Sequence, residues 1–255
     1  MSWATKRRLF ILLIIGSVVA AFLAVVLIAT FYKSPSCSDG VQNQGETGID
    51  CGGPCPYRCA LDEQPPVVLF TQVLPNNGRT DIIASVENKN IDAAAKDVPY
   101  TIALYDANHA HLRDISGMFD LPAAQSVPIF VPNVFADTQI VVASAFLTVD
   151  PSAPKWFSMT NDPRIVPSVS NITQTGTAAA PRIEAVLSNP SATLLNDVLT
   201  IVVVKDMQGN VIAASQTIVP LIPAQGQATA TFTWNGAFST TTASIQVTPI
   251  IPFPD

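Results

Sequence analysis

The sequence DIIASVENKN at residues 81–90 alternates apolar and polar side chains, which is the pattern of a half-buried β-strand. The sequence RIEAVLSNPS at residues 182–191 has the same pattern in the same register. The matched pairs are Ile82 with Ile183, Ala84 with Ala185, Val86 with Leu187, and Asn88 with Asn189. We therefore expect the chain to form this strand twice.

Three further stretches repeat in the same order. Residues 98–109 match 198–210, residues 121–130 match 222–232, and residues 140–149 match 243–251, all at an offset of about 100 residues. Ordered matches at one offset are typical of a duplicated unit, and about 100 residues is the size of an immunoglobulin-like sandwich. The sequence therefore predicts an all-β fold with two tandem immunoglobulin-like β-sandwiches, at residues 65–158 and 159–255.

Composition agrees with short strands. Charged residues make up 13% of the chain and proline occurs 21 times, which suits strands joined by proline turns better than long helices. The QPP sequence at residues 64–66 is predicted as a linker before the first sandwich. Residues 150–167 are predicted as the hinge between the two copies.

Each copy has enough inward-facing positions for a hydrophobic core. The predicted core of the first copy is Val73, Ile82, Ala84, Val86, Ile102, Leu104, Phe130, Val142 and Phe146. That of the second copy is Val169, Ile183, Leu187, Val202, Val204, Phe232, Ile245 and Val247. Trp156 and Trp234 are interpreted as core or hinge packing, because tryptophan is usually highly buried.

Residues 9–32 carry no charge over 24 positions. As a helix they would extend about 36 Å, enough to cross a hydrocarbon core of about 30 Å. Lys6, Arg7 and Arg8 precede the segment and a single Lys33 follows it, so the positive-inside rule predicts a cytoplasmic N-terminus and an extracytoplasmic remainder. We predict that residues 1–33 form a cytoplasmic tip and a retained single-pass anchor in the cell membrane. A cleaved signal peptide is the alternative, with a shorter apolar core of about 7–15 residues.

The charge balance argues against one class of partner. After the apolar segment the chain has 10 basic and 19 acidic residues, a net charge of −9. The basic residues are scattered and form no run that would neutralise successive phosphates. Nucleic acid is therefore not an expected partner.

All four cysteines lie in CSDGVQNQGETGIDCGGPCPYRC at residues 37–59. Outside the cytoplasm, an even number of cysteines in so short a segment predicts a disulfide framework, here a small module at residues 34–64 held by Cys37, Cys51, Cys55 and Cys59. Four cysteines allow three pairings, and the sequence does not choose among them. Zinc is the alternative, although four-thiolate sites usually show paired C-x2-C spacings that this segment lacks.

The same segment contains hard oxygen ligands. Asp39, Asn43, Glu46 and Asp50 alternate with glycines that would let a loop wrap around an ion. The spacing is not that of an EF-hand, and acidic turns rich in glycine are often solvated. Calcium at these four residues is a candidate metal site, and no other cofactor is expected.

The pattern C-x-D-G-x-x-N-x-x-E-x-x-x-D-C-G-G-x-C at residues 37–55 resembles a cysteine cassette of surface and secreted proteins. This resemblance implies a juxtamembrane extracellular module with no enzymatic activity. The sequence IALYD at residues 102–106 is similar to the signature of FxLYD domains, with Ile102 in place of phenylalanine. The stretches ENKN and SNPS resemble the turn of late-embryogenesis-abundant WHy domains. Both families imply small immunoglobulin-like sandwiches, mostly extracellular or membrane-tethered.

The chain shows little sign of catalytic chemistry. It lacks a G-x-S-x-G elbow, an H-E-x-x-H motif and a glycine-rich phosphate loop. His109 and His111 lie in a predicted hairpin turn with no third metal ligand in register. Asp106 and Asp206 fall at matching hairpin ends, where turn chemistry favours aspartate. We therefore predict that the protein is not an enzyme.

Three functions remain as hypotheses. The leading one is a binding or scaffolding module for a protein or glycan partner. The alternatives are a structural subunit or spacer of a cell-envelope assembly, in which self-association is possible, and a hydrolase with an unrecognised carboxylate site. Asn171 begins an N-x-T sequon, which predicts an exposed position.

Overall fold

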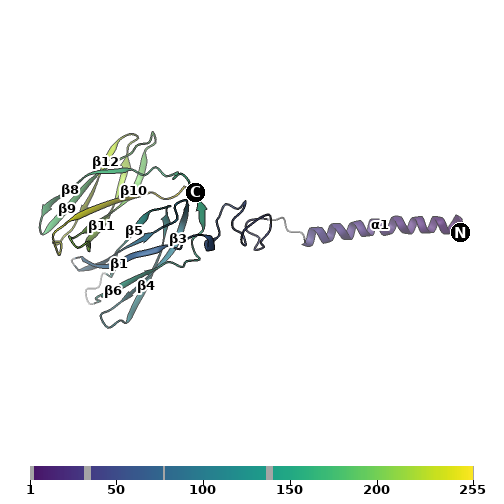
Figure 1. The fold of residues 1–255 in the computed structure, drawn as a ribbon, viewed down its shortest axis with the longest axis horizontal. Coiled ribbons are helices and arrows are strands. Elements are labelled where there is room, and N and C mark those ends of the chain that lie inside the picture. The colour runs from purple at the N-terminus through teal and green to yellow at the C-terminus, as the bar shows by residue number, and fades with distance from the viewer. Residues whose placement is uncertain (1–2, 32–35, 77, 136–139, 255) are drawn as a thin grey trace. The chain divides into compact units, whose positions relative to one another are not determined.

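The computed structural model describes residues 3–31, 36–76, 78–135 and 140–254. The chain forms two compact units, Met1–Cys55 and Pro56–Asp255. The first holds one helix and a disulfide-bonded loop, and the second holds all the β-strands (Figure 1). The prediction of an all-β body after a single N-terminal helix is confirmed.

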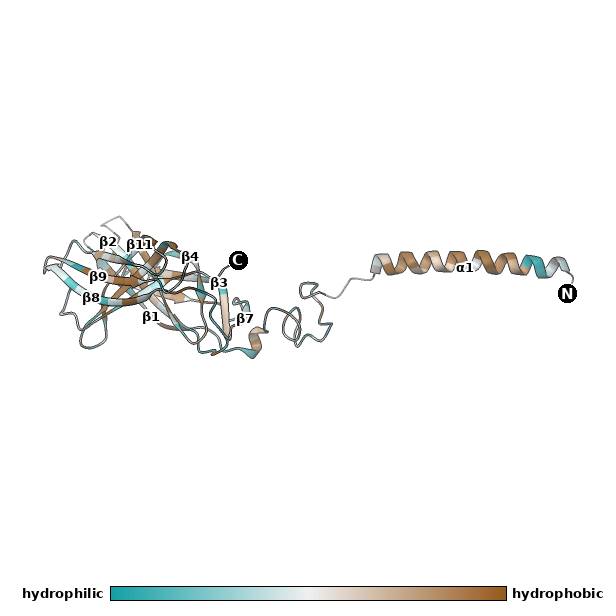
Figure 2. Ribbon diagram, turned by 90° about the horizontal axis from the view of Figure 1, so that it is seen from above, coloured by the Kyte–Doolittle hydropathy of each residue, from teal (hydrophilic) through white to brown (hydrophobic). Residues whose placement is uncertain are grey.

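Helix α1 covers Trp3–Phe31. Within it, Thr5–Thr30 is a candidate membrane span with a mean hydropathy of 3.2 and no buried residue. Figure 2 shows the helix as almost entirely hydrophobic, with hydrophilic residues near its start. Its hydroxyls donate back to the helix, Ser17 to the Ile14 carbonyl and Thr30 to the Val26 carbonyl. The helix can therefore lie in an apolar medium without leaving these polar groups unpaired.

The first sandwich consists of two antiparallel sheets. One has the order β1-β2-β5, from β1 (Val67–Asn76), β2 (Arg79–Glu87) and β5 (Ser126–Phe135). The other has the order β4-β3-β6, from β4 (His111–Leu121), β3 (Ala93–Tyr105) and β6 (Ser144–Thr148). The short strand β7 (Trp156–Ser158) also pairs with β3, and a 3-10 turn, Ala60–Asp62, precedes β1.

The second sandwich has the same strand order, with each label raised by seven. Its first sheet has the order β12-β9-β8, from β8 (Ser168–Thr177), β9 (Ala180–Ser188) and β12 (Gln227–Thr233). Its second sheet has the order β11-β10-β13, from β10 (Leu195–Lys205), β11 (Val211–Ile222) and β13 (Ser244–Ile250). The strands that the sequence matched thus occupy equivalent places in the two sandwiches.

Each sandwich has its own hydrophobic core. The first is built around β2, β3 and the fully buried Trp156. The second is built around β9, β10 and Phe232, and it includes Trp234. The predicted core residues that are buried are Ile82, Ala84, Val86, Ile102, Leu104, Val142, Ile183, Leu187, Val202, Val204, Phe232 and Val247. Val73, Val169 and Ile245 are half-buried against these cores.

Two residues that were predicted to lie in the core of the first sandwich, Phe146 and Phe130, lie outside it. Phe146 is 58% exposed, because in β6 its neighbours Ala145 and Leu147 face the core and Phe146 faces outward against Tyr105. The prediction of Phe146 as a core residue was wrong, because the opposite face of β6 is the buried one. Phe130 packs outside the first core, in the contact between the two sandwiches.

The two sandwiches pack directly on one another through sheet faces. Leu74 and Ile83 of the β1-β2-β5 sheet contact Ile201 and Val203 of β10, together with residues of β11. Strand β2 is consequently buried on both faces from Asp81 to Val86, so its alternating sequence does not produce an exposed side. The contact places residues of both sandwiches in one buried cluster within the Pro56–Asp255 unit.

The segment that follows β6 is hydrogen-bonded to the first sandwich. In the predicted hinge, β7 pairs with Ala93 to Ala95 of β3, and the Met159 N–H donates to the Asp92 carbonyl. The 150–167 segment is therefore anchored along part of its length.

Asn88 and Asn189 play equivalent structural roles. The Asn88 side chain is buried, its Nδ2 donates to the carbonyls of Ala93 and Pro122, and its Oδ1 accepts from the Asn90 N–H. The buried Asn189 side chain makes the corresponding bonds. Its partners are the Thr193 and Pro223 carbonyls and the Ser191 N–H. The repeated asparagine thus closes the turn that connects the two sheets of each sandwich.

We expect Asn88→Ala and Asn189→Ala each to lower the free energy of unfolding by about 2 kcal/mol, because each leaves buried backbone groups without a partner. Urea unfolding of the full chain in detergent, followed by circular dichroism, measures the loss. Asn196→Ala, at an exposed position of β10, is the matched control and should change stability by less than about 0.5 kcal/mol. Equal effects for Asn88→Ala and Asn196→Ala would contradict this role.

Candidate functional site

The carboxylates of the cassette accept hydrogen bonds from backbone N–H groups of their own loop. Asp39 Oδ1 accepts from the Val41 N–H, and both carboxylate oxygens of Asp50 accept from the Gly40 N–H. Buried Glu46 accepts from the N–H groups of Asn43 and Asp50. These bonds give the acidic residues a structural role in holding the loop closed.

The glycines of the cassette follow from its tight folding. Gly53 has a φ of +57°, and a Cβ placed on it would lie 2.1 Å from the Gly45 carbonyl oxygen. Gly52 has a φ of +72°, and its Cβ would meet the Thr47 side chain. The two adjacent glycines are therefore required where the loop passes close to itself.

All four cysteines are oxidised. Cys37 is bonded to Cys55, and Cys51 and Cys59 are also disulfide-bonded. The disulfide prediction is confirmed, and zinc bound by four thiolates is wrong for this chain because no cysteine is a thiolate.

Within the described residues, one group of potential metal ligands comes together, formed by Cys37, Glu46 and Cys55. Two of its members are joined in a disulfide and offer no thiolate. Asp39 and Asp50 are not part of this group. Calcium at Asp39, Asn43, Glu46 and Asp50 stays a prediction. The three carboxylates accept hydrogen bonds within the loop, whereas Asn43 Oδ1 is buried without a hydrogen-bond partner among the described residues.

The histidines and hairpin aspartates lie in or beside hairpin turns, where both histidines are exposed and Asp206 is buried. Asp106 Oδ1 accepts from the N–H groups of Asn108 and Ala110, and Asp206 Oδ1 accepts from those of Gln208 and Asn210. His111 Nε2 lies 2.7 Å from Asp114 Oδ1, with both side chains about half exposed. Asp106 and Asp206 thus serve as turn residues at the ends of matching hairpins.

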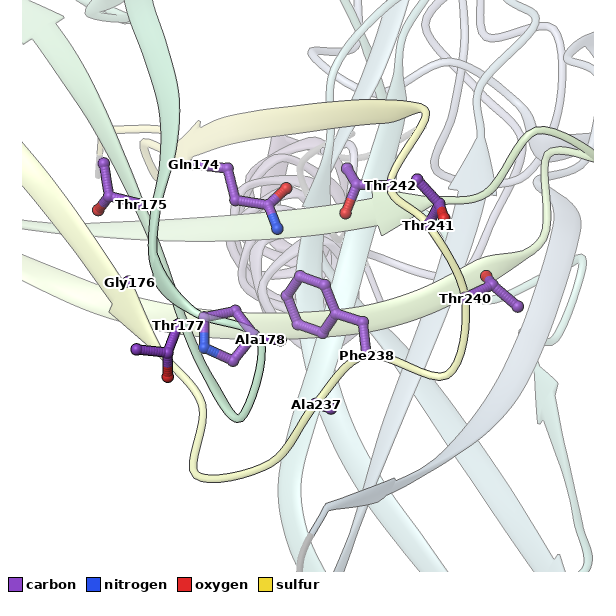
Figure 3. Close-up of a pocket in the computed structure, with 11 residues that line it drawn as sticks. Gln174, Thr175, Gly176, Thr177, Ala178, Ala237, Phe238, Thr240, Thr241 and Thr242 are labelled. Atoms are coloured by element: carbon purple, nitrogen blue, oxygen red, sulfur yellow. The ribbon is translucent and has the colours of Figure 1, made fainter.

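A groove of about 500 Å³ lies in the second sandwich, between the β8–β9 turn and the loop that follows β12 (Figure 3). Gln174, Phe238 and Thr242 come together at the centre of the view, with Thr175, Thr177 and Thr240 around them. Phe238 is held by an edge-to-face contact with the buried Trp234, at 5.0 Å between ring centroids. None of the eleven described residues that line the groove carries a charge.

No sequence pattern indicated this groove. Its residues come from 174–181, at the end of the β8–β9 hairpin, and from 237–242, in the loop after β12, so the two sets are far apart in the chain. The threonine run at 240–242 was the available signal, and threonines are common in solvated loops. The register of β9 between β8 and β12 brings the two loops together.

A second cleft, of about 680 Å³, lies in the Pro56–Asp255 unit and is lined by residues from both ends of that unit. Its walls include the aromatic rings of Tyr57, Phe157 and Phe253 and three charged side chains, Lys96, Asp97 and Lys155. Lys96 Nζ lies 3.4 Å from the Pro254 carbonyl oxygen. This cleft combines apolar surface with charged side chains of both signs, in contrast to the uncharged groove.

The C-terminal segment forms part of this cleft and connects the two sandwiches. The Phe253 N–H donates to Asp120 Oδ2 at 2.6 Å, and its ring packs edge-to-face on Phe157. Arg164 lies over the Phe253 ring and donates to the Ile251 carbonyl. Its bonds to Asp162 lower the pKa of that carboxyl below its usual value, despite partial burial.

Arg58 fastens residues 56–64 to the first sandwich. Its guanidinium donates to both carboxylate oxygens of Asp92, to Glu63 and to the Ser158 hydroxyl. These hydrogen bonds and charges hold the pKa of Asp92 below its ordinary value. Asn90 adds a pair of bonds between its side-chain amide and the Gln64 backbone.

We expect Arg58→Gln to reduce the hydrogen-exchange protection of residues 58–64 at neutral pH. In the unaltered protein this protection should be complete at pH values above about 3.9, the ordinary aspartate pKa. It should disappear as the pH falls through the lowered pKa of Asp92, because protonation removes the charge that pairs with Arg58. Protection factors corrected for intrinsic exchange, measured at neutral and acid pH, test this. Arg182→Gln, which removes an exposed ion pair with Glu184, is the control and should leave the segment unchanged. Full protection in Arg58→Gln at neutral pH would contradict the role.

Comparison with known proteins identifies no family. No family model and no curated protein matches the chain. Among solved structures, it is similar to red sea bream transglutaminase, with 13% identity, a TM-score of 0.26, and coverage of 75% of this chain and 32% of that one. It is also similar to a β-glucuronidase of glycoside hydrolase family 2, with 9% identity, a TM-score of 0.23, and coverage of 82% and 26%. The chain thus spans a third or less of either protein, and at these TM-scores neither likeness supports a function.

Proposed function

We propose that the protein is a single-pass, membrane-anchored surface protein whose two sandwiches form a binding or scaffolding module for a protein or glycan partner. The observation that carries this proposal is the exposed apolar helix at Thr5–Thr30, followed by an oxidised cassette and a β-sheet body. A helix of this length suits a bilayer, and disulfides persist outside the cytoplasm. Lys6, Arg7 and Arg8 at the start of the helix support a cytoplasmic N-terminus.

The arrangement of the body supports a presenting role. The sandwiches are joined by a sheet-to-sheet contact, and the C-terminal segment crosses between them. Their matching strand orders, with the paired Asn88 and Asn189 turns, support a tandem duplication. The resemblance of IALYD to FxLYD domains and of the ENKN and SNPS turns to WHy domains agrees with extracellular modules of this kind. Two sandwiches that contact each other can present their grooves and loops together to a partner.

A structural subunit of an envelope assembly is the second candidate, and one surface favours it. The sheet face that packs on the first sandwich through Ile201 and Val203 continues along β10 and β11 to Leu199 and Ile218, which lie opposite each other. Ile218 is 61% exposed, and Leu221 farther along β11 is 47% exposed. Apolar side chains on an outer strand favour association with a neighbouring copy or subunit.

Proximity labelling on intact cells tests the proposal, with the label fused after Asp255 and an anchor-only chain as the control. Enrichment of one external protein or receptor supports a binding module. Recurrent enrichment of a single envelope complex, lost with Ile218→Asp, supports the structural subunit. Labelling of cytoplasmic proteins alone contradicts the proposed topology.

A further inference from the structure

We infer that the groove formed by Gln174, Phe238 and the threonines around them binds a neutral saccharide. This inference rests on the proposed binding function and specifies the class of ligand at one site.

The absence of charge defines the first property of the ligand. Each of the eleven described lining residues is a neutral polar, small or apolar residue. A sulfated, phosphorylated or carboxylated ligand would lose hydration on entering the groove without meeting a cation, which opposes binding. The cleft with Lys96, Asp97 and Lys155 differs in this respect, because charged side chains line it. The uncharged groove therefore selects neutral ligands.

The ring of Phe238 provides the apolar part of the site. Its contact with Trp234, with an angle of 82° between the rings, fixes its orientation, and the side chain is only half-buried. A rigid aromatic ring at a partly open wall contributes dispersion and hydrophobic contact at little loss of side-chain entropy. The C–H face of a sugar ring is a flat apolar surface that can pack against it.

The polar groups complement a hydroxylated ligand. The Gln174 amide provides two donors and an acceptor, and each threonine hydroxyl both donates and accepts. Sugar hydroxyls have the same dual capacity, so either side can adjust to the other. Thr242 Oγ1 is buried without a hydrogen-bond partner in the described part of the chain. Such a hydroxyl is costly to leave unpaired, and a small shift of its loop would offer it to a ligand.

The volume and shape agree with this class of ligand. About 500 Å³ falls in the range of about 300–1,000 Å³ typical of small-ligand sites. The groove lies between two turns, and Gly176, with a φ of +83°, makes the tight β8–β9 turn whose Cβ position is blocked by the Ala180 carbonyl. A side chain there would disturb the wall of the groove, so glycine preserves its form.

The test uses the full-length chain in lipid nanodiscs, because sugar-headed detergents would compete. Maltohexaose, cellohexaose, mannohexaose and N-acetylchitohexaose are the neutral probes, and hyaluronan and heparin hexasaccharides are the anionic ones. Saturation-transfer NMR should detect at least one neutral probe and neither anionic probe. Gln174→Ala and Phe238→Ala should each weaken binding of that probe by about tenfold or more.

Gln216→Ala is the matched control, since Gln216 is exposed on β11, in the other sheet of the same sandwich. It should leave binding unchanged. Because Phe238 contributes to the core, Phe238→Ala is informative only if its circular dichroism spectrum matches that of the unaltered protein. If the spectra differ, the result for Gln174→Ala, which changes an exposed residue, decides the test.

Binding of none of the neutral probes, preference for an anionic probe, or binding that Gln174→Ala leaves intact would each overturn the inference. If proximity labelling still enriches the partner in cells that carry Gln174→Ala, the proposed binding function holds, but the partner contacts a different surface. If Gln174→Ala loses both saccharide binding and partner enrichment, the result supports the saccharide site and the proposed binding function.

Discussion

Trp156→Ala is expected to lower the free energy of unfolding by about 3–5 kcal/mol, the usual result of truncating a large buried aromatic. Trp156 has no exposed surface and belongs to the first core. Its indole Nε1 has no hydrogen-bond partner among the described residues, so the loss comes from packing and the cavity left behind. The substitution also removes the side chain that holds β7 against β3, so residues 156–159 should exchange amide hydrogens faster.

Urea unfolding followed by circular dichroism measures this effect without relying on tryptophan fluorescence. Phe146→Ala is the matched control, because it also removes an aromatic ring from the first sandwich but at a position that is 58% exposed. Its effect should be about 1 kcal/mol or less. Similar losses for the two variants would show that Trp156 is not a core residue.

The double substitution of Cys37 and Cys55 by alanine is expected to unfold the cassette locally. Among the described residues 36–55, Glu46 alone is buried, so this segment has no hydrophobic core to replace the bond. The two cysteines are 18 residues apart, and closing a loop of this length stabilises by about 3 kcal/mol in the chain-entropy account. The glycine turn at Gly52 and Gly53 and the carboxylate bonds of Glu46 depend on this closure.

Hydrogen exchange and limited proteolysis of the full chain measure the change. Residues 37–50 should lose protection and become cleavable, while the unfolding of the two sandwiches should shift by less than about 0.5 kcal/mol because each has its own core. Val41→Ala, at a cassette position that is 56% exposed, is the control and should leave the pattern of cleavage unchanged. A cassette that remains protected without the Cys37–Cys55 bond would show that the carboxylate and glycine contacts suffice.

The sequence by itself determined the large divisions of this protein. An uncharged run of 24 residues is long and apolar enough to predict a helix that crosses a bilayer. The alternation at residues 81–90 and 182–191 specified two equivalent strands, because side chains in a strand alternate between its faces. Asn88, Asn189, Asp106 and Asp206 were predicted at turns, where their side chains bond to nearby backbone.

The tertiary structure decided what periodicity leaves open. Alternation defines two faces but not which of them is buried, so Phe146 was assigned to the wrong face of β6. Burial of β2 and β10 on both faces depends on one sandwich packing on the other, a contact between residues more than 100 positions apart. The groove of Gln174, Phe238 and Thr242 likewise exists only because the pairing of β8, β9 and β12 brings two polar loops together. Such long-range pairing follows from packing free energy over the whole fold and leaves no local pattern in the sequence.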